Sequence, residues 1–265
     1  MSPRTISSLT NPAVKSVRAL HMRRARQESG LFLVEGLRSI AEAVSLGQAP
    51  RILMYGEAVS GHPLLREAAA VAGETVEVTP AILAKISRRE NPQMVVGVFE
   101  QTLGGLSDIE PANARCWVGL ESVRDPGNLG TIIRTADAAG CGGVILIGDC
   151  CDPFSVETVR ATMGSIFAVQ VVTASVTEFL EWRPTWPGGM VGALLSATTG
   201  FRDVAYRDPT LILMGNEQAG LTAEMAGACD LSVRIPMRGR ADSLNLAVAT
   251  GIMVYAVMET VATIS

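Results

Sequence analysis

The sequence predicts an α/β protein made of two successive series of alternating strands and helices. Apolar runs of strand length recur between segments with helical periodicity, which is the pattern of an α/β fold. In the second half most of these runs are continuously apolar, as in parallel strands covered on both faces. Hydrophobic residues make up 48% of the 265 residues, enough to bury a core for each series.

The segment over residues 103–113 separates the two series. It contains Gly104-Gly105 and Pro111, which favour an irregular connection. We therefore expect a first domain over residues 1–102, a linker over 103–113 and a second domain over 114–265.

The first series begins with a basic helix over about residues 13–28. Asn11-Pro12 is a helix-start signal and Ser29-Gly30 a stop signal. Strands are expected at 31–34, 51–55, 75–78 and 94–99, with helices near 37–46, 63–71 and 80–86. This alternation predicts a small α/β sandwich.

The second series has six expected strands, at 116–120, 144–147, 167–172, 191–197, 211–214 and 232–235. Helices should follow Gly127, Ser175, Leu221 and Asp242, with another near Pro153. The last helix, over about 243–263, is apolar on more than one side and must be buried on more than one side. Either a second subunit or another segment of the same chain could cover the additional face.

Several classes of protein are excluded by composition. The five cysteines are odd in number and irregularly spaced, so we interpret them as free thiols in a reducing compartment, the cytoplasm. The only histidines are His21 and His62, and no metal-ligand spacing occurs, which predicts no metal site. The first residues lack an apolar signal segment. The longest apolar run, 246–258, falls short of the roughly 18–20 residues that span a bilayer, so we expect no membrane association.

Charge is unevenly distributed along the chain. The net charge of −4 argues against a uniformly basic nucleic-acid binder, yet six of the first 30 residues are basic and only Glu28 is acidic. A basic segment on an acidic chain suits a local contact with phosphates. The candidate RNA-binding residues are Lys15, Arg23, Arg24 and Arg26. An ordinary solvated helix face is the alternative.

The first of three polar motifs is Asp125-Pro126-Gly127-Asn128-Leu129-Gly130, followed by Arg134. It lies where a strand gives way to a helix, at the end of a parallel sheet where ligands bind. Asn128 is expected to cap the helix, whose positive end suits a phosphate. Arg134 adds a permanent cation. Taken alone, the motif also fits a capped helix with a surface arginine.

The second motif is Gly215-Asn216-Glu217-Gln218-Ala219-Gly220, after the apolar run 211–214. Glu217 must be solvated, paired or hydrogen-bonded there, and it could hold Asn128 or Arg134. An acid in the first turn of a helix is the alternative.

The third motif runs from Ile235-Pro236-Met237 to Ser243-Leu244-Asn245. Pro236 should end the strand. Asp242 or Ser243 is expected to cap the last helix, with Asn245 in its first turn.

Together, and in this order, the three motifs resemble those of the SpoU–TrmH family of RNA 2′-O-ribose methyltransferases. The resemblance implies functional side chains at Asn128, Arg134, Glu217, Ser243 and Asn245. It also implies that S-adenosylmethionine is bound largely by main chain. The implied cofactor-binding positions are Ser196, Ala197, Met214, Gly215, Asn216, Gly220, Ile235, Met237, Ser243 and Leu244.

The resemblance also implies a fold. The second domain would be a parallel-sheet SPOUT domain with a C-terminal trefoil knot, working as a homodimer with its active site at the subunit interface. Residues 6–42, with Asn91-Pro92-Gln93, resemble the family's L30e-like substrate-binding domain. One departure is that Val156 and Glu157 follow Asp-Pro-Phe-Ser, where the family often has proline and lysine. Arg160 is the candidate replacement for that lysine.

The expected reaction is S-adenosylmethionine-dependent methylation of a ribose 2′-hydroxyl in structured RNA, with 23S rRNA as the favoured target. Arg134 would grip the adjacent phosphate and orient the hydroxyl. A tRNA methyltransferase and a non-catalytic RNA-binding protein on the same scaffold are the alternatives. A nucleotide-dependent oxidoreductase is disfavoured because the glycines over 140–143 precede a strand, and the lack of a Gly-Lys pair excludes a P-loop.

Overall fold

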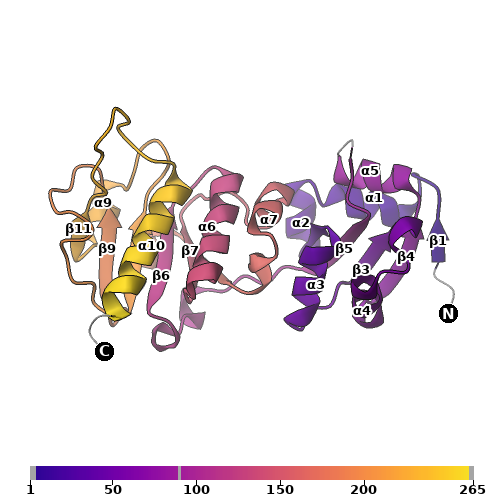
Figure 1. Ribbon diagram of the computed structural model, residues 1–265, viewed down its shortest axis with the longest axis horizontal. Coiled ribbons are helices and arrows are strands. Elements are labelled where there is room, and N and C mark those ends of the chain that lie inside the picture. Colours follow the sequence, from indigo (N-terminus) through magenta and orange to yellow (C-terminus); the bar gives the residue numbers. More distant parts are fainter. Residues whose placement is uncertain (1–3, 89–90, 263–265) are drawn as a thin grey trace. The chain divides into compact units, whose positions relative to one another are not determined.

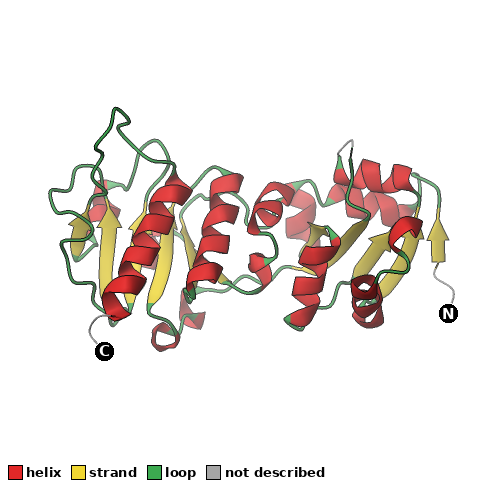
Figure 2. Ribbon diagram, viewed as in Figure 1, coloured by secondary structure: helices red, strands yellow, loops and turns green. Residues whose placement is uncertain are grey.

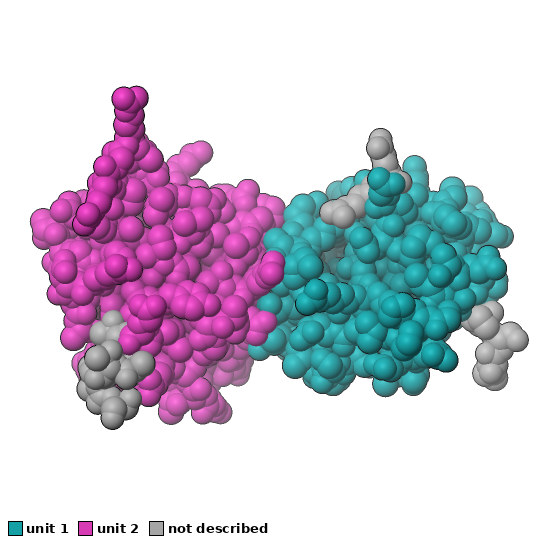
Figure 3. Space-filling model, viewed as in Figure 1, with its two compact units in different colours: residues 1–102, 152–168 teal, residues 103–151, 169–265 magenta. Residues whose placement is uncertain are grey.

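The computed structural model describes residues 4–88 and 91–262. The chain forms two compact units (Figure 3). Unit 1 consists of Met1–Thr102 and Asp152–Ala168, and unit 2 of Leu103–Cys151 and Val169–Ser265. The chain therefore passes between the units three times, and residues 152–168 pack with the N-terminal unit although they lie far along the sequence.

Unit 1 is built on a five-stranded mixed sheet in the order β1-β4-β3-β5-β2 (Figures 1 and 2). Its strands are β1 (Arg4–Ile6), β2 (Leu31–Glu35), β3 (Ile52–Tyr55), β4 (Glu74–Val78) and β5 (Val95–Glu100). Strand β4 pairs parallel with β1 and β3, whereas β5 pairs antiparallel with β2 and β3. The helices are α1 (Pro12–Ala19), α2 (Arg23–Ser29), α3 (Leu37–Ser45), α4 (Pro63–Val71), α5 (Pro80–Ser87) and α7 (Val156–Thr162).

The basic helix expected over 13–28 is in fact two helices, α1 and α2. Met22 is extended, with φ −90° and ψ 129°, and interrupts the helical hydrogen bonding between them. The break allows Leu20, 4% exposed, to pack in the core of unit 1 while Arg26 is buried separately. Strand β1 was not expected because three residues carry no readable alternation.

The segment 152–168 contributes to the interior of unit 1. Phe154 lies 4.7 Å from Phe32 between ring centroids, and Phe167 lies 4.9 Å from Phe99 and 5.7 Å from Phe32. Tilted aromatic contacts at these distances stabilise a core beyond simple burial. Phe167, expected to open a strand at 167–172, instead ends the 3₁₀ turn Ser165–Phe167, and strand β8 begins only at Gln170.

Unit 2 contains an all-parallel six-stranded sheet in the order β11-β9-β10-β6-β7-β8. The strands are β6 (Cys116–Glu121), β7 (Gly143–Ile147), β8 (Gln170–Ala174), β9 (Gly189–Ala193), β10 (Thr210–Met214) and β11 (Leu231–Val233). The helices are α6 (Pro126–Ala139), α8 (Val176–Trp182), α9 (Ala223–Gly227) and α10 (Leu246–Ala262). Helices α6 and α10 lie side by side (Figure 1). The predicted α/β class and parallel second sheet are confirmed, while the knot stays a prediction.

The last helix begins at Leu246, three residues later than expected, and its expected end at Thr263 lies outside the described residues. Within the described part of the chain, none of the helices has the length and apolar character needed to cross a membrane.

Candidate active site

The first and second motifs leave the sheet next to each other. Strands β6 and β10 are neighbours, and their last paired residues are Leu120 and Met214. Asp125, not Asn128, caps helix α6, because its carboxylate accepts a 2.6 Å hydrogen bond from the amide of Asn128. The Asn128 side chain is therefore available for contacts outside its own helix.

Glu217 joins the second motif to the first. Its carboxylate accepts hydrogen bonds from the amide of Asp125 at 3.0 Å, the amide of Arg124 at 3.2 Å and Asn128 Nδ2 at 3.3 Å. Burial raises the pKa of Glu217, but these donors, led by the Asp125 amide, outweigh it and lower the pKa below its usual value. Glu217 is thus held as a carboxylate.

Asn128 in turn joins the third motif, because its Oδ1 accepts a 2.9 Å hydrogen bond from Asn245 Nδ2. Asn245 is also the residue that caps α10, its Oδ1 accepting from the amides of Ala247 at 2.9 Å and Val248 at 3.3 Å. This corrects the expected cap at Asp242 or Ser243. The geometry thereby brings together one polar side chain from each motif, Glu217, Asn128 and Asn245.

The second motif is folded tightly on itself. Asn216 and Gly220 exchange two main-chain hydrogen bonds, of 3.0 and 2.9 Å. A side chain at Gly215 would overlap the main chain of Gly220, so only glycine fits there. The Asn216 side chain donates a 2.8 Å hydrogen bond to the carbonyl of Ser122, which fixes the loop against the end of β6.

A cavity of about 310 Å³ lies beside this network. Eight of the ten positions expected to bind cofactor line it: Met214, Gly215, Asn216, Gly220, Ile235, Met237, Ser243 and Leu244. Ser196 and Ala197 do not. Strand β9 ends at Ala193, and the chain turns back there, so that Ala193, Leu194 and Leu195 line the cavity in their place.

The lining suits a cofactor that has a flat base, a sugar and a charged tail. Leu195, Ile235 and Leu244 offer apolar walls for a base. The closely folded main chain of 215–220 and the Ser243 hydroxyl offer polar groups for a sugar, and the Glu217 carboxylate offers negative charge for a cationic tail. Its volume falls at the lower end of the range of small-molecule sites, roughly 300–1,000 Å³. These residues fit S-adenosylmethionine.

Arg134 lies apart from this network. Its side chain is exposed on α6 and makes no hydrogen bond or ion pair with the residues that the structure describes, and it does not line the cavity. It follows Asn128 by six residues, which is about 9 Å along a helix. Of the two partners considered for Glu217, the carboxylate binds Asn128 and, within one chain, does not contact Arg134.

The basic residues of unit 1 divide into two groups. Lys15, Arg23 and Arg24 are exposed, and Arg24 pairs with Glu28 at 2.7 Å. Arg26, in contrast, is 3% exposed, and its guanidinium binds the Asp152 carboxylate at 2.6 Å and the Leu20 carbonyl at 2.8 Å. The expectation that Arg26 contacts RNA is corrected, because its charge and donors are used inside unit 1.

Arg160, the candidate replacement for a phosphate-binding lysine, is similarly engaged. Its guanidinium donates to the Glu35 carboxylate at 2.7 Å and to the Ser87 carbonyl at 3.0 Å. The Glu35 side chain is 2% exposed. Arg160 therefore pairs with a buried acid of unit 1.

Four residues near the site were not singled out from the sequence: Arg124, Asp149, Glu121 and Thr222. Arg124 pairs with Asp149 at 2.6 Å on an adjoining cleft of about 360 Å³, which Asn216, Glu217 and Gln218 also line. Glu121 is a buried acid at the end of β6, bonded to Thr222. In the sequence, Glu121 is recognisable as an acidic residue at the end of an apolar strand. No cluster of side chains able to hold a metal ion occurs within the described ranges.

A parallel sheet whose carboxyl-end loops enclose a mixed polar and apolar cavity defines an α/β enzyme that binds a nucleotide-like ligand. Residues 115–255 match the SpoU rRNA Methylase family, and residues 11–97 match the MRM3-like substrate binding domain. The chain belongs to the SpoU rRNA methylase family, and the resemblance read from the three motifs is confirmed.

Similar proteins include RNA methyltransferases of known target. The chain is 35% identical to a 23S rRNA (uridine(2479)-2′-O)-methyltransferase of Streptomyces viridochromogenes, over 89% of this chain and 86% of that one. It is 30% identical to the 23S rRNA (guanosine(2553)-2′-O)-methyltransferase RlmP of Bacillus subtilis, over 94% and 97%. The structure of an AdoMet-bound rRNA methyltransferase from Sinorhizobium meliloti is 45% identical, with a TM-score of 0.89 and 97% of each chain covered.

Proposed function

We propose that the protein transfers the methyl group of S-adenosylmethionine to a ribose 2′-hydroxyl of ribosomal RNA, with 23S rRNA as its target. The observation that carries this proposal is the chain of hydrogen bonds Glu217–Asn128–Asn245 beside a cavity that fits the cofactor. The names of the 23S rRNA methyltransferases from Streptomyces and Bacillus support the substrate. The cytoplasm is the proposed compartment.

The bound cofactor supplies an electrophilic methyl group on a sulfonium. The residues of the chain have to position the ribose, since alignment of the reacting atoms alone contributes up to about 7–11 kcal/mol in favourable cases. Asn128, Asn245 and Ser243 would hold the ribose and cofactor in place. Arg134 would grip the adjacent phosphate and orient the hydroxyl. Because a guanidinium stays protonated, Arg134 acts as a positive charge and a donor and not as a base.

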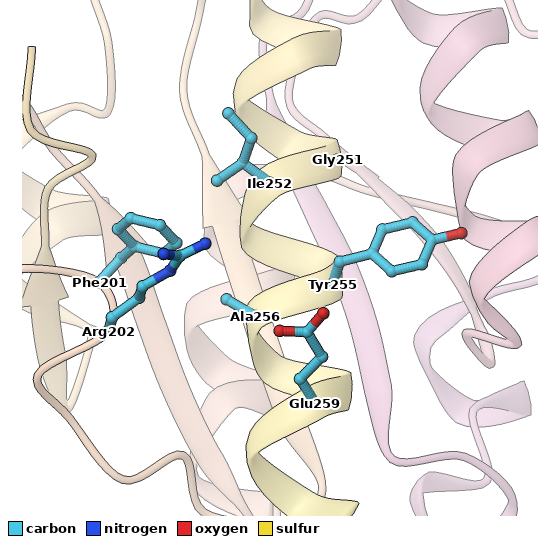
Figure 4. A pocket seen from close by; sticks show the side chains of 7 residues that line it. All are labelled: Phe201, Arg202, Gly251, Ile252, Tyr255, Ala256 and Glu259. Atoms are coloured by element: carbon cyan, nitrogen blue, oxygen red, sulfur yellow. The ribbon is translucent and has the colours of Figure 1, made fainter.

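We also propose that the protein works as a homodimer through α10. Leu244, Val248 and Tyr255 are apolar side chains that are 38–52% exposed. Beside them is a pocket of about 430 Å³, in which Ile252 faces Phe201 and Arg202 while Tyr255 reaches out on the other side of the helix (Figure 4). A second copy would cover this face, and an exposed Arg134 on the neighbouring α6 would reach the cavity of the partner.

The reaction is tested by incubating the purified protein with S-adenosylmethionine carrying a labelled methyl group and with ribosomal RNA lacking native modification. We expect label at a 2′-oxygen of one nucleotide, mapped by resistance of the adjacent bond to alkaline cleavage. If only tRNA were labelled, the substrate would be tRNA and not ribosomal RNA. RNA binding with no transfer at all would identify a non-catalytic binding protein.

The dimer is tested by sedimentation and by mixing variants. Val248→Glu should give monomers, since a charge would be buried at the interface. Mixed Arg134→Ala and Glu217→Gln subunits should recover activity that each lacks alone, because one mixed site would contain both native residues. Sedimentation of the native protein as a monomer at assay concentration would contradict this assembly.

A further inference from the structure

Glu121 is a buried acid whose carboxylate is held by hydrogen bonds. It ends strand β6, is 3% exposed, and forms no ion pair within the described ranges. Burying an ionised group is costly unless hydrogen bonds compensate for lost water. Here the compensating donors belong to one residue, Thr222, whose amide donates to Glu121 Oε2 at 2.9 Å and whose hydroxyl donates to Oε1 at 2.8 Å.

Thr222 lies where the second motif ends. The loop leaves β10 at Gly215, directly beside the point where Glu121 leaves β6, since Leu120 and Met214 are the last paired residues. It turns back on itself through the paired main chains of Asn216 and Gly220 and reaches Thr222, the N-cap of α9. Glu121 therefore adjoins the start of the loop along the sheet and binds its end through a side chain.

The same loop forms one wall of the cofactor cavity. Gly215, Asn216, Glu217, Gln218 and Gly220 all line it. The Asn216–Ser122 bond fixes the first part of the loop to the end of β6, and the Glu121–Thr222 bonds fix its last part to the same strand. Besides the Asn216–Gly220 pairing and the packing of Leu221 on the core, the Glu121–Thr222 bonds are what tie the end of the loop to β6.

We propose that Glu121 is a positioning residue for the cofactor, which acts by clamping the loop 215–222 through Thr222 in the shape that lines the cavity. This inference rests on the proposed function, because it names a residue that orders the cofactor-binding wall. A loop held in its bound shape before the cofactor arrives loses less conformational freedom on binding. The clamp therefore contributes to affinity without touching the cofactor.

Thr222→Val and Thr222→Ser form the matched test, because Thr222 is exposed and either side chain fits there. Valine keeps the shape but removes the hydroxyl, and with it both the bond to Glu121 and the cap of α9, while serine keeps both. Glu121→Gln leaves the cap intact and so isolates the clamp. By calorimetry with the full-length protein, we expect Thr222→Val to weaken S-adenosylmethionine binding about tenfold, as loss of a hydrogen bond to a charged group can do. Thr222→Ser should bind within about twofold of the native protein, and Glu121→Gln should weaken binding in the same direction as valine.

Two further measurements separate positioning from a general loss of stability. Amide hydrogen exchange of residues 215–222 should speed up in Thr222→Val while exchange in β6 and β10 stays unchanged. RNA affinity should also stay unchanged. The control is Thr185→Val, which removes another threonine hydroxyl bond in unit 2, the 2.8 Å bond to the Trp182 carbonyl, far from the motif in sequence. It should leave cofactor binding unaffected.

The proposal is overturned if Thr222→Val binds the cofactor like the native protein, or if loop exchange is unaltered. It is also overturned if Thr185→Val weakens cofactor binding to the same extent. If the native protein itself binds no S-adenosylmethionine, the proposed function fails and the positioning role fails with it. If the native protein and the Thr222→Val variant both bind S-adenosylmethionine normally, only the clamp is disproved and the proposed function is unaffected.

Discussion

Arg134 has an environment unlike that of the other motif side chains, since it is exposed and without a bond to any described residue. Its removal should cost little stability. We predict that Arg134→Ala abolishes methylation and leaves S-adenosylmethionine affinity within a few fold, because the cavity lining is unchanged. Initial rates and calorimetry would check this. Arg115→Ala is the control, since Arg115 is an exposed arginine of the same unit, 3.8 Å from Asp208. Substantial turnover by Arg134→Ala would remove Arg134 from the mechanism.

Glu217 should make stability depend on pH. Burial raises its pKa, but the donors from Asp125, Arg124 and Asn128 lower it overall below 4.5. A carboxyl group with a lowered folded-state pKa stabilises the protein above its unfolded-state pKa, and this contribution disappears as the pH falls through the folded-state value. We predict that the difference in unfolding free energy between native protein and Glu217→Gln is largest near neutral pH and shrinks below pH 4.5. Urea unfolding at a series of pH values measures it, and a difference constant with pH would contradict the proposed environment.

At the scale of helices and strands, the sequence predicted the six parallel strands of unit 2 because most of them are continuous apolar runs. It also predicted that three polar loops would lie at strand ends. The particular side-chain partners were not predictable, since Asn128 and Asn245 are separated by 117 residues, and only the folded sheet decides that they meet. The helix caps were misplaced for a related reason. Asp125, Asn128, Ser243 and Asn245 are all good capping residues, and local propensity does not choose among them.

The partners of the basic residues in α1 and α2 were likewise not predictable from local sequence. Lys15, Arg23 and Arg26 look alike in sequence, but of these three Arg26 alone has a partner from residues 152–168. We predict that Lys15→Gln, Arg23→Gln and Arg24→Gln together reduce both RNA affinity and its dependence on salt, since fewer counterions are released. Arg26→Gln should leave the salt dependence unchanged but destabilise unit 1 by about 3–5 kcal/mol, because Asp152 would be left as an unpaired carboxylate. Binding titrations at several salt concentrations and urea unfolding distinguish the two effects. An unchanged salt slope in the triple variant would make this surface an ordinary solvated face.

For the whole molecule, the important feature is that unit 1 is not continuous in sequence. Residues 1–102 contain Arg26 and Glu35, but their partners, Asp152 and Arg160, come from the later segment. The match to the substrate binding domain ends at residue 97, and the match to the methylase family begins at residue 115. Neither match shows that residues 152–168 belong to unit 1. Residues 152–168 lie within the range that matches the methylase family but pack in unit 1. The folding of unit 1 therefore depends on a segment from that range.

We predict that a fragment of residues 1–102 alone does not fold cooperatively. It would leave the buried guanidinium of Arg26 and the buried carboxylate of Glu35 unpaired. It would also expose the faces of Phe32 and Phe99 that Phe154 and Phe167 cover. Removing one partner of a buried pair costs about 3–5 kcal/mol, and two such losses approach the total stability of a small domain, about 5–15 kcal/mol. A flexible linker joining residues 152–168 to residue 102 should restore a sharp transition. Thermal unfolding followed by circular dichroism compares the two fragments, and a sharp transition of the same midpoint in both would show that the segment is dispensable.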